Sequence, residues 1–172
     1  MEKEVFYDSP IFGPLTKEEY QQFLCKLPQS SSDPVVTYHG FDYNPHGICL
    51  NPNKERFGDK NYYVELRTAQ NKAGRWVYAI DFSMNGGGWS YGVSCGGEGF
   101  ETENEAKFAL LCYAEQGIRR RMERIREIPD IDEDDGFDYG QEKLYKSQIK
   151  NCQNLLKKVL YYQEVYNNQT LF

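Results

Sequence analysis

Three segments decide the fold: YYVELRT (Tyr62–Thr68), RWVYAIDFSM (Arg75–Met84) and WSYGVSC (Trp89–Cys95). Apolar side chains alternate with polar or small ones in each segment, which is the pattern of a strand with one buried face. The connections Asn71–Gly74 and Asn85–Gly88 are short and rich in residues that accept positive φ. The sequence therefore predicts an antiparallel meander of three or four strands with one apolar face.

We expect that apolar face to be a dry layer beneath a helix. Its aromatic members are Trp76, Tyr78, Phe82, Trp89 and Tyr91. The residues expected to cover them are Leu110 and Tyr113. The opposite face of the third segment is small (Ser90, Gly92 and Ser94), and small side chains let another backbone approach closely. That backbone belongs either to the N-terminal part of this chain, or to a partner protein or a nucleic acid.

A long helix of roughly 25 residues is expected from Thr102 onward. Thr102-Glu103-Asn104-Glu105 is a capping box, in which the Thr102 side chain accepts a backbone hydrogen bond and the Glu105 side chain reaches back. The apolar positions that follow at helical spacing are Ala106, Leu110, Tyr113, Gly117, Ile118, Met122 and Ile125. Further apolar residues lie off that stripe, so we expect a sheet on one side of this helix and another helix on the other.

Residues 140–167 are predicted to form a second long helix. Its apolar seam has positions four and three apart, with one polar interruption: Tyr145, Ile149, Cys152, Leu156, Val159, Gln163 and Tyr166. Two interpretations follow. The seam packs antiparallel on the first long helix, or it joins two copies of the chain in a coiled-coil homodimer.

The N-terminal 60 residues are less regular. A second capping box, Thr16–Glu19, predicts a short helix to Leu27, and Pro34–Tyr38 is a candidate strand. The segment Phe41–Asn61 is predicted to be a turn-rich loop with a short strand near Ile48–Leu50.

The predicted fold is a single α+β domain over residues 1–172. A three- or four-stranded antiparallel meander packs against a long helix, and a second long C-terminal helix completes a helical layer. The parts are the N-terminal helix and irregular segment 1–60, the meander and helix 61–128, an acidic linker 129–139 and the C-terminal helix 140–172.

Composition favours a globular chain. The 172 residues are 40% hydrophobic and 15% aromatic, which is enough for a sizeable core. No apolar run reaches membrane-spanning length, and the N-terminus lacks a signal peptide's apolar core. The five cysteines are odd in number and scattered, so we expect reduced thiols and a cytoplasmic location.

Charge is distributed unevenly. Residues 128–142 hold seven carboxylates and no basic residue, so the chain's net charge of −6 becomes +1 for everything else. The end of the first long helix is basic, with Arg119, Arg120, Arg121, Arg124 and Arg126 against Glu123. This cluster is either a solvated helix end, paired with the acidic linker, or a phosphate-binding patch.

Catalytic and metal-binding signatures are weak. Gly92–Gly96 has the spacing of a nucleophile elbow, but it does not turn directly into a helix, and both histidines precede its serine. The set His39, His46 and Cys49 matches no standard metal spacing. Asp130, Asp132 and Asp134 resemble the start of a calcium loop, yet the required glycine and glutamate are each one residue late. That stretch is either a solvated linker or a Ca²⁺ site, and we expect no enzyme activity, no cofactor and no structural metal.

The segments Arg75–Phe82 and Gly99–Ala106, joined by a glycine-rich turn and a third strand, carry a family resemblance. They resemble the meander-plus-helix of AP2-type and integrase arm-type DNA-binding domains, with a Trp/Tyr strand followed by a G-F-x-T-x-x-E-A helix start. They are also similar to small uncharacterised modules near ParB-like and DNA-methylase proteins of phages and plasmids. The resemblance covers about 45 residues. It implies that basic and aromatic outward residues of the sheet read DNA.

These patterns predict a non-enzymatic binding protein of a mobile genetic element, with nucleic acid as its partner. The residues expected to contact phosphates are Arg67, Arg75, Arg119, Arg120 and Arg124. The alternative is a protein-interaction module or an inhibitor of a host protein, dimeric through the C-terminal helix.

Overall fold

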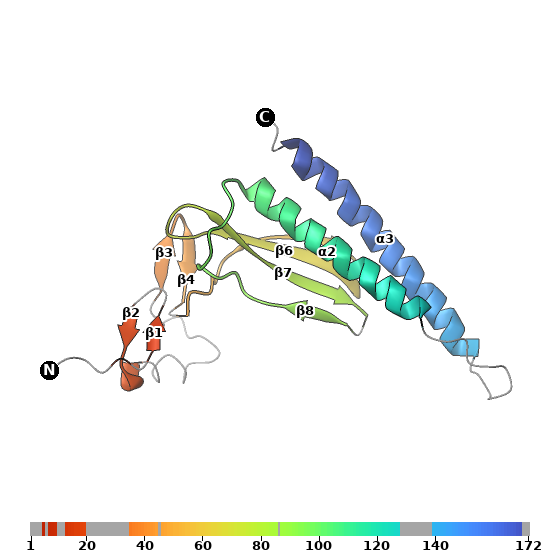
Figure 1. The fold of residues 1–172 in the computed structure, drawn as a ribbon, viewed down its shortest axis with the longest axis horizontal. Helices are drawn as coiled ribbons and strands as arrows, with labels where there is room; N and C mark the ends of the chain where they lie inside the picture. Colours follow the sequence, from red (N-terminus) through yellow and green to blue (C-terminus); the bar gives the residue numbers. More distant parts are fainter. Residues whose placement is uncertain are drawn as a thin grey trace.

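The computed structural model describes residues 5, 7–9, 13–19, 35–44, 46–85, 87–127 and 139–169. Its body is a four-stranded antiparallel sheet, in which each strand pairs with the next one along the chain. The strands are β5 (Asn53–Gly58), β6 (Tyr62–Gln70), β7 (Trp76–Met84) and β8 (Gly88–Ser90). Two long helices cover one face of this sheet (Figure 1). The predicted α+β class and the meander are confirmed.

The turns form as the sequence predicts. The Asn71 side chain accepts hydrogen bonds from the backbone N–H groups of Ala73 and Arg75, each at 3.0 Å. Gly74 completes this turn at φ 75°, in the left-handed region that favours glycine. In the next turn Asn85 takes φ 41°, and the Met84 N–H donates to the Gly87 carbonyl at 2.7 Å.

Two strands differ from the prediction. The fourth strand, β5, lies where a loop was expected, because its charged residues hide the alternation and only Phe57 is buried. The third predicted strand ends at Ser90 rather than Cys95. After Ser90 the chain pairs with the N-terminal segment instead, so the Cys49 N–H donates to the Val93 carbonyl at 2.8 Å.

The small residue Gly92 explains that change of partner. A Cβ atom on Gly92 would lie 2.5 Å from Cγ2 of Ile48, so only glycine permits this approach. The bridge between Ile48 and Ser94 and the hydrogen bond from Cys49 to Val93 show that the backbone approaching these small residues is the chain's own, which was one of the predicted alternatives.

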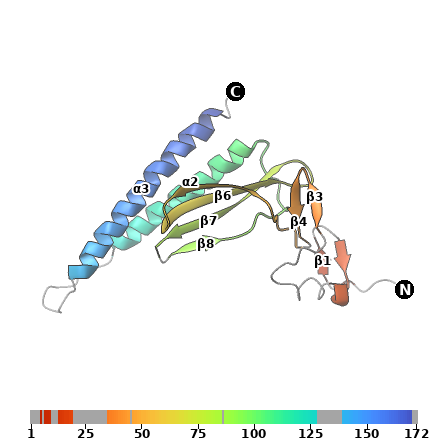
Figure 2. The same ribbon diagram turned by 180° about the vertical axis from the view of Figure 1, so that it is seen from behind.

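The first long helix is α2 (Glu103–Arg126), and its predicted capping box is present. The Glu105 N–H donates to Oγ1 of Thr102 at 3.2 Å, and the Thr102 N–H donates to Oε2 of Glu105 at 3.0 Å. The second is α3 (Tyr139–Gln169), which runs antiparallel beside α2 (Figure 2). Within the part of the chain that the structure describes, neither helix is long and apolar enough to cross a membrane.

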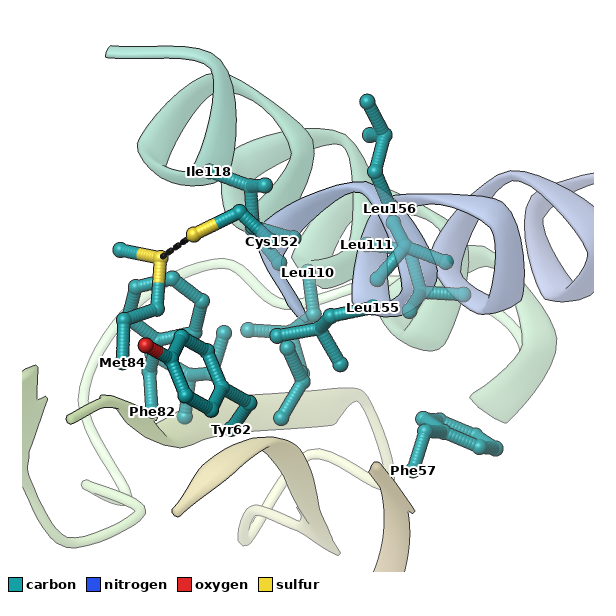
Figure 3. Packing of buried hydrophobic residues seen from close by; sticks show 14 of the residues in the cluster. Phe57, Tyr62, Phe82, Met84, Leu110, Leu111, Ile118, Cys152, Leu155 and Leu156 are labelled. Carbon is teal, nitrogen blue, oxygen red and sulfur yellow. Dashed lines mark hydrogen bonds between the residues drawn. The ribbon is translucent and has the colours of Figure 1, made fainter. Parts of the chain in front are cut away.

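The main core lies between the sheet and the two helices (Figure 3). The α3 residues buried in it include four of the seam: Cys152, Leu156, Val159 and Tyr166. The prediction that the seam packs on α2 within one chain is confirmed, and a dimer through α3 stays a prediction.

A second core lies under the opposite face of the sheet. The hairpin of β3 (Val36–Tyr38) and β4 (Phe41–Tyr43) packs there against β6, β7 and the segment after β8. The hydroxyl of Tyr43 donates to the Gln70 carbonyl at 2.9 Å, and burial raises the pKa of that phenol. The strand expected over Pro34–Tyr38 is confirmed for Val36–Tyr38, and Pro34 lies outside the described residues.

The N-terminal part adds the hairpin of β1 (Tyr7–Ser9) and β2 (Gly13–Leu15). The capping box at Thr16 is present, because the Glu19 N–H donates to Oγ1 of Thr16 at 3.3 Å. The continuation of that helix to Leu27 and the acidic linker with its calcium-loop resemblance lie outside the described residues. The described cysteines are free: Cys49, Cys95, Cys112 and Cys152.

The predicted dry aromatic layer is wrong in part. Phe82 is buried beneath the helices together with Leu110, as predicted. Trp76 instead packs half-buried against the second core, next to Phe41. The remaining rings are partly exposed: Tyr78, Trp89, Tyr91 and the expected cover residue Tyr113. The physical reason is an offset of the helical layer toward β5. Helix α2 lies over β6 and β7 and α3 lies over β5 and β6, so β8 stands at the edge of the sheet away from α3 (Figure 1).

Candidate functional site

A groove of about 410 Å³ opens where the helical layer stops short of β8. From the sheet side it is lined by Met84, Gly87, Gly88 and Trp89. From α2 it is lined by Tyr113, Gln116, Gly117, Arg120, Arg121 and Arg124. Apolar and basic side chains therefore meet in one depression.

Helical spacing brings the α2 residues together. Tyr113, Gly117, Arg120 and Arg124 are four, three and four positions apart, and such residues share one side of a helix. The arginines near the C-terminal end of α2 also lie at the negative end of the helix dipole, which stabilises their positive charge. One side of α2 thus carries a tyrosine at mid-helix and arginines in its last two turns.

Trp89 forms the sheet-side wall. Its ring lies 4.7 Å from the Phe82 ring, which anchors it to the core, and 6.0 Å from the Tyr113 ring in an edge-to-face arrangement. Trp89 nevertheless stays 37% exposed and Tyr113 47% exposed. Two large rings are thus held in place while part of each faces solvent.

The arginines of the groove have no acidic partner in the part of the chain that the structure describes. Arg120 and Arg124 are exposed and Arg121 is half-buried. Among the described residues, no carboxylate lies within ion-pair distance of any of these three guanidinium groups. No carboxylate of the described residues therefore neutralises their positive charge.

Arg119 points elsewhere. Its Nε lies 2.8 Å from Oε1 of Glu115, and Glu115 also accepts from Gln163 of α3 at 2.9 Å. The Gln163 hydrogen bond, followed by the one from Arg119, lowers the pKa of the Glu115 carboxyl. Arg119 thus belongs to the contact between the helices and does not line the groove.

The two sheet arginines are also engaged. Arg67 lies on the opposite face of the sheet, with Nη2 2.8 Å from Glu65 and 2.8 Å from Asp81. Arg75 holds the loop before α2, with Nη1 2.8 Å from Glu101 and Nη2 donating to the Gly99 carbonyl at 3.2 Å. Of the five arginines named from the sequence, the structure brings together Arg120 and Arg124 but not the other three.

Sequence reasoning placed Trp89 and Tyr113 in the core and so missed them as site residues. The signal available was the helical spacing that relates Tyr113 to Arg120 and Arg124. A second basic surface was also missed. Residues 143–168 of α3 hold five lysines and one glutamate, and the lysines are exposed.

A partly buried polar network lies at the other end of α2. Oγ1 of Thr68 donates to Oε1 of Glu103 at 2.7 Å, and Nζ of Lys107 lies 3.0 Å from Glu55 and 3.3 Å from Glu103. Burial opposes the Glu103 charge, but hydrogen bonds from Thr68 and Asn53 and the Lys107 ammonium lower its pKa overall. This network ties α2 to β5 and β6, which is a structural role.

The described residues show no arrangement suited to metal binding or to a nucleophile elbow. No three His, Cys, Asp or Glu side chains lie together as metal ligands in the described part of the chain, which includes His39, His46 and Cys49. Ser94 sits in a loop that bridges to Ile48, and its Oγ accepts from the Gly96 N–H at 3.2 Å.

The chain matches no protein-family model, no curated protein and no solved structure. Its function is therefore inferred from the geometry of the groove.

Proposed function

We propose that this protein is a non-enzymatic nucleic-acid-binding protein and that the groove between β8 and α2 is its contact surface. The observation that supports this most strongly is the set of three arginines without an acidic partner among the described residues, facing two partly exposed aromatic rings. A cytoplasmic location and an origin in a mobile genetic element are parts of the proposal that come from the sequence alone.

The chemistry of the groove fits a phosphate backbone. A guanidinium group presents a planar fork of donors that matches phosphate oxygens, and it stays charged at any physiological pH. Releasing counterions from the nucleic acid supplies most of the affinity in such contacts. The exposed lysines of α3 add positive charge elsewhere on the surface of the protein.

The proposal does not include Arg67, Arg75 or Arg119. Each has a carboxylate at 2.8 Å, so a phosphate would have to displace an existing ion pair. The outer face of the sheet, which the resemblance to DNA-binding domains would use, is also covered at one end by the β3–β4 hairpin. The contact surface is therefore proposed on the helix side.

Fluorescence anisotropy with labelled DNA and RNA, single-stranded and duplex, tests this proposal. At low salt we expect binding that the double substitution Arg120→Gln/Arg124→Gln weakens at least tenfold. Arg126→Gln is the matched control, because Arg126 is exposed on the same helix but does not line the groove. A wild-type protein that binds none of these nucleic acids at low salt contradicts the proposal.

The alternative function is a protein-interaction module that dimerises through α3. Leu144 and Tyr161 favour it, because these α3 residues are 48% and 61% exposed. Sedimentation or light scattering at high salt measures the oligomeric state directly. A salt-insensitive dimer that Tyr161→Asp dissociates would support the alternative, and a monomer at high protein concentration would rule out the dimer.

A further inference from the structure

A row of exposed aromatic rings continues from the groove along the uncovered part of β7. Trp89, Tyr113, Tyr91 and Tyr78 are between 37% and 47% exposed. Tyr91 follows Trp89 by two positions in the chain and is 45% exposed. Burial, followed by the phenols of Tyr113 and Tyr78, raises the pKa of the Tyr91 hydroxyl. At the far end the Tyr78 ring packs 5.6 Å from the Phe100 ring. Folded proteins rarely leave so many large rings together in solvent without a function.

The rings at both ends of this row are held in place by the body of the protein. Trp89 packs against Phe82. It also lies close to Gly117, since a Cβ atom on that glycine would be 3.1 Å from Cη2 of Trp89. Tyr78 belongs to β7 and is supported by Phe100. Little ordering is needed before these rings bind a flat ligand, which lowers the entropic cost of association.

A polymer that carries flat apolar faces and regularly spaced negative charges would satisfy both halves of the surface. Nucleobases stack on aromatic side chains, and phosphates pair with arginine. In a duplex the base faces are covered by their neighbours, so the rings would gain nothing from it. An unpaired strand presents base faces and phosphates at the same time.

We infer that the groove and the aromatic row bind a single-stranded nucleic acid, with phosphates on Arg120, Arg121 and Arg124 and unpaired bases stacked on Trp89, Tyr113 and Tyr91. This inference rests on the proposed function and adds to it the strand state of the ligand. The path of the bound nucleic acid follows the row of aromatic rings, from the C-terminal turns of α2 toward Tyr78.

The test compares two probes of about 12 nucleotides, a length within the range of single-strand sites: an oligothymidine and a blunt duplex. We expect the oligothymidine to bind at least tenfold more tightly at equal salt. Tyr91→Leu and Tyr113→Leu should each weaken its binding by about fivefold to 150-fold, the range that corresponds to the loss of one stacked base. The salt dependence of binding should stay unchanged in both variants, because no charge is removed.

Tyr161→Leu is the matched control, since it removes an even more exposed tyrosine from α3. A second measurement does not depend on the stability of the tyrosine variants. In Trp76→Phe protein the remaining Trp89 reports alone, and we expect oligothymidine to quench its fluorescence.

Different results would contradict nucleic-acid binding and the preference for a single strand. If neither probe binds at low salt, the proposed function and this inference fall together. If the duplex binds as tightly as the oligothymidine, Trp89 fluorescence does not change and the tyrosine variants behave like Tyr161→Leu, the single-strand inference is overturned while nucleic-acid binding stands.

Discussion

Trp89 lies directly against Gly117: a Cβ on this glycine would be 3.1 Å from Cη2 of the indole. Glycine in the middle of a helix is less favourable than alanine by about 1 kcal/mol. Its presence in α2 is explained by the close approach of Trp89, which forms the wall of the groove. The Trp89 indole thus packs directly on the backbone of α2 at Gly117.

Gly117→Ala tests that relationship. We expect the free energy of unfolding to stay unchanged or to rise slightly, within about 1 kcal/mol. The gain in helix propensity offsets the cost of the tight contact between the new Cβ and the Trp89 ring. The Trp89 ring should move outward, which in a Trp76→Phe background shifts the Trp89 fluorescence to longer wavelength and also weakens nucleic-acid binding. Gly96→Ala, where a Cβ would meet only Oγ of Ser94 at 3.6 Å, is the control. Unchanged Trp89 emission in Gly117→Ala would contradict this account.

Arg67 is predicted to act in stability alone. It lies between Glu65 and Asp81, which face each other directly across β6 and β7. Arg67→Gln leaves two like charges opposite each other, so urea denaturation should show a loss of about 1 kcal/mol. Adding Asp81→Asn should restore part of that loss. Nucleic-acid affinity should not change. A clear drop in affinity would indicate that the nucleic acid contacts the face of the sheet that carries Arg67, opposite the helices.

The Glu103 network predicts a pH dependence of stability. Because the folded protein lowers the pKa of Glu103, the stabilisation is fully present above its ordinary value of 4.5 and is lost as the pH falls through the folded value. Glu103→Gln should cost about 1–3 kcal/mol at neutral pH, the usual range for a charged hydrogen-bonded group. The difference from wild type should shrink in acid.

Glu101→Gln is the control for that series. Its carboxylate pairs with Arg75 just before α2, but the side chain is 77% exposed, so its loss should be within about 1 kcal/mol. An equal effect of the two substitutions, or a Glu103→Gln difference that grows in acid, would contradict the assignment.

Local patterns predicted most of the architecture. The capping box at Thr102 and the turn at Asn71 formed as expected, because each is satisfied by hydrogen bonds between residues close in sequence. The seam of α3 was recognised, and its place on α2 was one of two alternatives that only the folded chain separates.

Long-range competition explains what was not predicted. The alternation continues past Ser90, but Ile48 takes over the pairing of the following residues, and no local signal reveals that. Trp89 and Tyr113 have core-like spacing and remain exposed because the helices sit toward β5. The arginines of the groove were visible in the sequence, whereas the partners that neutralise Arg67 and Arg75 were not.

The salt dependence of oligonucleotide binding tests the central claim most directly. For single strands, the slope of log K against log salt is about −0.7 for each phosphate neutralised. Arg120→Gln/Arg124→Gln should therefore make the slope shallower by about 1.4, with Arg126→Gln close to wild type. A wild-type slope in the double variant would show that these arginines do not contact phosphates and would contradict the account.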